Sequence, residues 1–306
     1  MTVQRVREEE PSEIRRRLYR RASWIAVAGN ALLAAAKGAA AWASGSSAVF
    51  ADAANSLSDT LYSLLMAVGL YLAQQPPDRG HPQGHSRFEP LVSLLIAVAM
   101  VAAGVTAARE SVLRLLSEPG SIATVWPTAA LLGGIVVKVA MYAVVRRIGD
   151  RARSPAVKAS ARDNLADVLT SGAALIGVWG ARLIHPLFDP VAGILVSLWI
   201  FRAVWEIVEE NLGYLTGRAA SPELHERIVE AASQVPGVLN VHQVIADHVG
   251  PEIRADIHVD VDGEMTLRQA HAIADRVEEE LEALPEVDLA FVHLEPVPRG
   301  GESPQA

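Results

Sequence analysis

The 306-residue chain contains no cysteine, which excludes disulfide bonds and thiolate metal ligands. About half of its residues (51%) are hydrophobic, and its net charge of −8 is spread unevenly. Residues 1–216 contain 21 basic and 17 acidic residues, whereas residues 217–306 contain six basic and 18 acidic ones. This change predicts two domains, 1–216 and 217–296, with a disordered tail at 297–306, and it argues against nucleic-acid binding.

The first domain is predicted to be an α-helical membrane protein. Six runs approach the roughly 20 apolar residues that cross a bilayer, at about 22–43, 48–73, 90–115, 122–145, 158–184 and 190–209. Basic residues are concentrated before the first run and in the loops at 74–89 and 146–158, while the 44–47 loop is uncharged. By the positive-inside rule, both termini and these two basic loops lie in the cytoplasm.

The second and fifth predicted helices carry related polar motifs. Residues 46–63 and 154–171 align at an offset of 108, with nine of 18 positions identical. The predicted topology orients the two helices oppositely, which is typical of inverted repeats in secondary transporters. Each copy contains one polar pair spaced by four residues, and therefore on one helix face: Asn55 with Asp59, and Asp163 with Asp167.

Both polar pairs lie near the predicted bilayer midplane, about 10–18 Å from one helix end at 1.5 Å per residue. Carboxylates in an apolar helix are costly to bury unless a cation compensates them, so protons or a metal ion are the expected partners. Lysines occur in the first and fourth helices, at Lys37 and Lys138. For Lys37, pairing with a carboxylate and facing a water-filled cavity both fit the sequence.

A short polar cluster, Asp78, His81 and His85, lies in the loop after the second helix. Its spacings suit one metal ion held in a folded loop, and a solvated loop without metal fits them equally well. The third helix, from about Pro90, and the sixth, after Asp189-Pro190, offer no metal ligands at depth and are predicted to be scaffold.

The acidic domain is predicted to be a small α+β unit of order α-β-β-α-β. A helix begins at Ser221-Pro222, with serine as the cap and proline in the first position. Alternating residues predict the strands, and Thr266 caps the second helix. The predicted ranges are 238–247 and 253–261 for the first two strands, 266–284 for the helix and 287–295 for the third strand.

Six of the nine histidines lie in this small domain, five of them on its predicted polar face. Together with one carboxylate they form a candidate metal site, although unliganded surface or core histidines are the alternative interpretation. The residues are His242, His248, His258, His271, His293 and Glu295.

The ordered set of motifs resembles the cation diffusion facilitator family over residues 18–296. The resemblance rests on Ser-Ala-Val-Phe-Ala-Asp-Ala-x-x-Ser-Leu-Ser-Asp in the second helix, Asp-x-x-x-Asp in the fifth, the His-Pro-Gln-Gly-His loop and the segment from His271. It implies a homodimer with six transmembrane helices per protomer and a cytoplasmic domain of ferredoxin or metallochaperone type. It also implies export of a divalent metal through the cytoplasmic membrane in exchange for protons.

By position, the resemblance implies three metal sites. The transport site is Asn55, Asp59, Asp163 and Asp167. The loop site is Asp78, His81 and His85. The cytoplasmic-domain site falls among His242, His258, His271, His293 and Glu295. This chain departs from the family after the sixth helix, where Leu215-Thr216-Gly217 replaces an acidic partner for the loop residue Arg87.

The transported metal is predicted to be Mn(II). Zinc-transporting members of the family usually have histidine where this chain has Asn55 and Asp163, and zinc prefers nitrogen or sulfur ligands. Sites made only of oxygen ligands suit manganese, magnesium and calcium. Export of Fe(II), Co(II) or Zn(II) is the alternative, followed by a membrane-anchored metal receptor. No nucleotide-binding loop or nucleophile–base pair indicates an enzyme.

Overall fold

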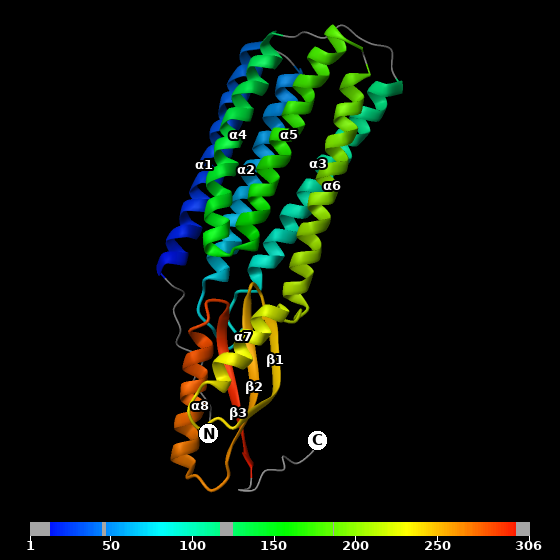
Figure 1. The fold of residues 1–306 in the computed structure, drawn as a ribbon. Helices are drawn as coiled ribbons and strands as arrows, with labels where there is room; N and C mark the ends of the chain where they lie inside the picture. The colour runs from blue at the N-terminus through cyan, green and yellow to red at the C-terminus, as the bar shows by residue number, and fades with distance from the viewer. Residues whose placement is uncertain (1–12, 45–46, 117–124, 186, 298–306) are drawn as a thin grey trace. The chain divides into compact units, whose positions relative to one another are not determined.

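A computed structural model of the chain describes residues 13–44, 47–116, 125–185 and 187–297. The chain divides into two compact units, Met1–Leu212 and Gly213–Ala306, each with its own apolar core. Figure 1 traces both units in chain order. The predicted disordered tail lies outside the described residues except for Val297, which ends a strand.

Six long helices form the membrane part of the chain (Figure 1). They are α1 Glu13–Ser44, α2 Ser47–Ala73, α3 Phe88–Leu116, α4 Val125–Ala152, α5 Pro155–Leu183 and α6 Phe188–Leu215. Helices of 27 to 32 residues extend over about 40–48 Å, enough to cross a bilayer. All six predicted helices are therefore present, and each is long enough to span a membrane.

Three stretches of the described helices are apolar enough to span a membrane by length and composition: Ser56–Ala73, Phe88–Leu113 and Pro190–Leu215. By contrast, α4 and α5 carry charged residues within their length, among them Lys138 and Asp167. Charged groups in such helices require partners inside the bundle.

Several helices extend beyond the predicted apolar runs, among them α1, which begins at Glu13 instead of about 22, and α4, which ends at Ala152 instead of about 145. The third and sixth helices were predicted to begin at about Pro90 and after Pro190, but α3 begins at Phe88 and α6 at Phe188. Proline is tolerated in the first turn of a helix because the N–H that it lacks would have no intrahelical acceptor there. Each proline therefore lies inside the first turn instead of preceding the helix. In addition, α6 continues to Leu215, beyond its predicted end at 209.

Helix packing brings the two copies of the repeat together. Helix α1 packs along α2 and α4 packs along α5, and the two pairs meet through contacts of α1 with α4 and of α2 with α5. Helix α3 contacts α2 and α5. Helix α6 approaches α3 closely at Gly104, where the side chains of Ile200 and Phe201 fill the space that a larger side chain would need. The polar motifs of α2 and α5 thus lie within one helix bundle.

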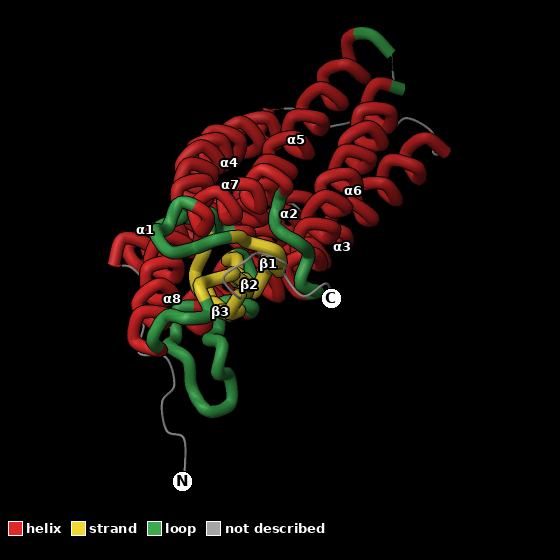
Figure 2. The backbone as a smooth tube through the Cα atoms, turned by 60° about the horizontal axis from the view of Figure 1, so that its bottom comes forward, coloured by secondary structure: helices red, strands yellow, loops and turns green. Residues whose placement is uncertain are grey.

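The second unit has the predicted order α-β-β-α-β (Figure 2). Its elements are α7 Pro222–Ser233, β1 Asn240–Val249, β2 Glu252–Asp262, α8 Leu267–Glu282 and β3 Val287–Val297. The sheet order is β1-β2-β3, with β1 antiparallel and β3 parallel to β2. Ser221 and Thr266 cap the two helices as predicted, and Gly250 turns between β1 and β2 at a φ of 70°.

One face of this sheet forms the core with α7 and α8. Alternate residues of β2, including Ile253, Ala255 and Ile257, are buried beneath the helices. The side chains between them, such as His258, point to the opposite face of the sheet. That face is therefore available for polar groups.

Candidate metal-transport site

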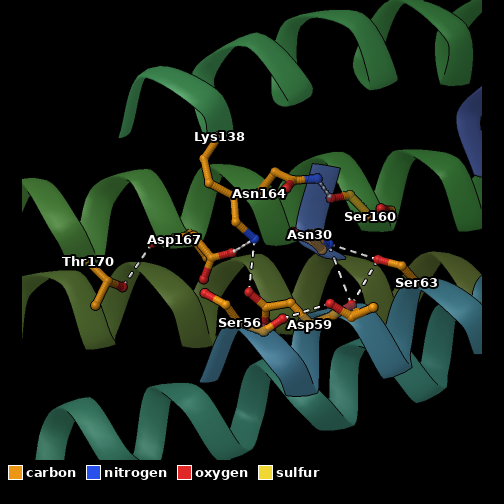
Figure 3. A network of polar contacts seen from close by, with 11 residues as sticks. Asn30, Ser56, Asp59, Ser63, Lys138, Ser160, Asn164, Asp167 and Thr170 are labelled. Atoms are coloured by element: carbon orange, nitrogen blue, oxygen red, sulfur yellow. Dashed lines mark hydrogen bonds and ion pairs between the residues drawn. The ribbon is translucent and has the colours of Figure 1, made fainter. Parts of the chain in front are cut away.

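Two aspartates from the two copies of the repeat share one ammonium group (Figure 3). Lys138 on α4 donates through Nζ to Oδ2 of Asp59 on α2 at 2.9 Å and to Oδ2 of Asp167 on α5 at 2.5 Å. Only 6% of the Lys138 side chain is exposed, against 12% and 24% for the two aspartates. The structure thus joins Asp59 and Asp167 within a single buried ion-pair network.

The other two residues of the predicted transport site are placed less completely. Asp163 lies one turn before Asp167 on α5, is half-buried, and interacts electrostatically with Asp59, Asp167 and Lys138. Asn55 lies one turn before Asp59 on α2, but its side chain is outside the part of the structure that can be described.

Neutral polar side chains surround the ion pairs (Figure 3). Asn30 on α1 donates to Ser63 Oγ at 2.8 Å and to the Asp59 carbonyl at 3.5 Å, and Ser63 Oγ donates to the same carbonyl. Asn164 is almost fully buried and donates to the Ser160 carbonyl. The Asn30 contacts join α1 to α2 at Asp59, whereas the Asn164 contact lies within α5, one turn before Asp167.

Sequence reasoning did not assign Lys138 and Asn30 to the site. The available signal was a strongly polar residue in the middle of each apolar span, which usually marks a functional position in a membrane protein. What the sequence could not provide was the packing of α1 against α2 and of α4 against α5, which aims these side chains at Asp59 and Asp167.

The loop residues Asp78, His81 and His85 are brought together. Their ligand atoms all lie within 4.8 Å of one another. The backbone N–H groups of His81 and Gly80 donate to Asp78 Oδ1 at 2.6 and 2.7 Å. The hydrogen bond from the His81 backbone is the main cause that lowers the pKa of the Asp78 carboxyl. The cluster therefore offers an ionised carboxylate beside two imidazoles.

The second unit gathers a further group on the open face of its sheet. His242, His258 and Glu295 also have ligand atoms within 4.8 Å of one another. His258 Nδ1 lies 3.0 Å from Glu295 Oε1, and this hydrogen bond is the main cause that lowers the pKa of Glu295. His293 is paired with His258 across β2 and β3, with ring centroids 4.7 Å apart.

Two other predicted histidines of this unit lie outside the group. His271 is on α8 and pairs with Asp275 at 3.5 Å. His248 packs its ring against Tyr214 at a centroid distance of 4.8 Å, and burial lowers its pKa. Within one chain, the predicted cytoplasmic-domain residues are therefore only partly assembled.

Comparison with known protein families gives one match for the helical part of the chain and another for the α+β part. Residues 23–216 match the cation efflux transmembrane domain, and residues 220–297 match the cation efflux protein, cytoplasmic domain. The chain belongs to the cation efflux (cation diffusion facilitator) family. An uncharacterized transporter of Methanocaldococcus jannaschii is 32% identical over 89% of this chain and 96% of its own length. The family assignment predicted from the motifs is confirmed.

Two further relatives are similar over most of this chain. The manganese efflux system protein MneS of Bacillus subtilis is 28% identical, covering 82% of this chain and 87% of its own length. The magnetosome protein MamM of Magnetospirillum gryphiswaldense is 31% identical, covering 83% and 81%. As a member of this family the protein is a membrane transporter of divalent metal cations and not an enzyme.

Proposed function

We propose that this cation efflux protein exports Mn(II) from the cytoplasm in exchange for protons, by alternating access. The observation that carries the proposal is the gathering of Asp59 and Asp167, with Asp163 nearby, inside a bundle whose six helices contain no histidine or cysteine. With Asn55 they form the proposed transport site. Its donors are three carboxylates and one amide.

The donor set supports manganese over the other metals. Zinc in four-coordinate sites prefers imidazole and thiolate ligands, which these helices lack. Magnesium sheds its water reluctantly, and calcium takes six to eight oxygen ligands. Similarity to the protein named manganese efflux system protein MneS points in the same direction.

Iron and cobalt are the nearest competitors, because affinity for a given site rises from Mn(II) through Fe(II) to Co(II). We infer that site geometry and metal supply decide against them.

The decisive experiment is transport by the purified full-length protein in proteoliposomes, with Mn, Fe, Co, Zn and Cd offered separately. We expect manganese flux that depends on a proton gradient, and much weaker zinc flux. Efficient zinc transport with poor manganese transport would refute the ligand-type argument while leaving the family assignment intact. In cells, deletion should sensitise growth to manganese far more than to zinc.

We propose further that the protein is a homodimer in the cytoplasmic membrane, with both termini in the cytoplasm. In this arrangement Asp78, His81 and His85 form a loop metal site on the cytoplasmic side. His242, His258, His293 and Glu295 form a second site. His271 would join this site only from the partner protomer. Counting bound metal per protomer after His85→Ala and after His258→Ala tests the two sites separately.

A membrane-anchored metal receptor is the competing function. It would require metal binding by the cytoplasmic unit but would give no reason for carboxylates inside the helix bundle. Metal-dependent flux through proteoliposomes separates the two functions directly, because a receptor would bind metal and carry none.

A further inference from the structure

Lys138 is a charged group that the proposed metal ligands do not include. It is a nearly fully buried lysine inside a membrane helix, and its ammonium contacts carboxylates from both copies of the repeat. A cation in this position is strongly disfavoured unless it is paired, so its location beside Asp59 and Asp167 is not incidental.

The inverted repeat shows which residue corresponds to Lys138. At the same offset of 108 residues that relates Asp59 to Asp167, Lys138 corresponds to Asn30. Each half of the bundle therefore inserts a nitrogen donor from its first helix toward its own aspartate-bearing helix: Asn30 toward the Asp59 carbonyl and Ser63, and Lys138 toward the Asp167 carboxylate. The two donors are equivalent in position, but only Lys138 carries a positive charge.

We propose that Lys138 is a tethered counter-cation of the transport site. Its ammonium occupies the carboxylates of Asp59 and Asp167 when metal is absent and is displaced from them when metal binds. This inference rests on the proposed function, because it requires that metal reach these two carboxylates. Lys138 is thus a built-in competitor that sets how tightly the metal is held.

Electrostatics requires the displacement. A divalent cation bound to the carboxylate oxygens would lie within a few ångströms of the ammonium, and like charges repel strongly at such separations in a poorly solvated site. The same interaction acts in reverse when the metal leaves, because the returning ammonium replaces one positive partner of the carboxylates by another. Metal release therefore does not leave Asp59 and Asp167 without a counter-charge.

The structure also contains acceptors for a displaced ammonium. Ser56 and Asn164 lie one turn before Asp59 and Asp167, respectively, and Asn30 lies on α1 (Figure 3). Among the described residues, Ser56 Oγ and the side-chain oxygens of Asn30 and Asn164 are buried without a hydrogen-bond partner. These neutral oxygens can accept from Lys138 once metal engages the carboxylates, so the lysine can remain within the bundle.

The test compares Lys138→Met with Lys158→Met, which removes a half-buried lysine from the first turn of α5, next to Gly149 of α4. Mn(II) binding and flux are measured on full-length protein that also carries His81→Ala and His258→Ala, so that loop and cytoplasmic-domain binding do not contribute. Lys138→Met should bind Mn(II) at least about tenfold more tightly and show a lower maximal flux, since a competing charge next to the metal is gone. KM and maximal rate should therefore fall together, and Lys158→Met should retain the wild-type affinity.

Two further variants make the outcome unambiguous. Lys138→Arg keeps the charge and should bind Mn(II) close to the wild-type level. Lys138→Gln, which keeps a donor without the charge, replaces Lys138→Met if that variant does not fold, and should also bind more tightly. Unchanged or weaker Mn(II) binding by a folded, charge-removing variant overturns the inference. If the wild-type protein carries no metal at all, the proposed function fails instead.

Discussion

At the residue scale, Asp59 and Asp167 have the same position in the two copies of the repeat, and both pair with the ammonium group of Lys138. Their equivalence in sequence is thus matched by a shared partner in space. Thr170 lies one turn beyond Asp167 on α5, but its hydroxyl only donates to the Ala166 carbonyl, and the residue is exposed. Asp167 and Thr170 are only three residues apart, but only Asp167 takes part in the ion pairs.

Asp167→Ala should abolish metal transport while the protein still folds and reaches the membrane, because the change removes a charged ligand of the proposed site. Lys138 retains Asp59 as a partner in this variant. Flux in proteoliposomes measures the effect, with Thr170→Ala as the matched control that should transport normally. Wild-type flux through Asp167→Ala would show that the site has been assigned to the wrong residues.

The metal preference should follow the donor atoms. In the double variant Asn55→His with Asp163→His, two imidazoles replace an amide and a carboxylate, and zinc flux should rise relative to manganese flux. The ratio of the two fluxes in one proteoliposome preparation is the measurement. A ratio that does not move toward zinc would mean that selectivity is decided outside these four ligands.

At the scale of elements, a buried polar contact joins α1 to α3. The Tyr19 hydroxyl donates to Glu89 Oε2 at 2.6 Å, and Arg15 Nε donates to the same hydroxyl at 2.9 Å. Glu89 is only 1% exposed, so its carboxylate depends on such partners. Because Glu89 is in the first turn of α3, the contact links the amino-terminal helix to the helix that follows the Asp78, His81 and His85 loop.

Tyr19→Phe should lower the free energy of unfolding by about 1.5–3 kcal/mol, since it removes a hydrogen bond to a buried carboxylate. Thermal or denaturant unfolding of the purified protein in detergent measures the change. Tyr71→Phe on α2 is the matched control, because Tyr71 is 64% exposed and loses little. Equal stabilities of the two variants would mean that the α1–α3 contact contributes nothing measurable.

At the scale of the whole molecule, charge is divided between the two parts of the chain. Residues 217–306 contain 18 acidic and only six basic residues. In the proposed homodimer, two such domains repel each other at low ionic strength. A divalent metal on His242, His258 and Glu295 would reduce this repulsion.

Metal should therefore draw the two cytoplasmic domains together, and chelation should separate them. Small-angle scattering or an inter-domain distance measurement on the 217–306 fragment, with and without Mn(II), tests this. His258→Ala should remove the response, whereas His225→Ala, an exposed histidine of α7 outside the cluster, should keep it. An unchanged distance at saturating metal would argue against a regulatory role for this domain.

The sequence alone was sufficient for the membrane helices, the order of the cytoplasmic elements and the family. Apolar length, the Ser221 and Thr266 caps and strand alternation are local properties, and the structure confirms the elements that they predicted. Where local rules were less informative, as at Pro90 and Pro190, the prediction missed the helix start by two residues or more. The sequence repeat shared by α2 and α5 was likewise evident from the sequence alone.

Only the tertiary structure decided which side chains meet. The β1–β2 register shifts between Val241 and Gln243, so His242 is an extra residue in the strand and is turned toward His258 and Glu295. No alternation pattern predicts such a bulge. Lys138 likewise reaches Asp59 and Asp167 only because α4 packs on α5 while α1 packs on α2. Contacts between residues 29 and 79 positions apart depend on how helices pack, and packing is a property of the whole bundle.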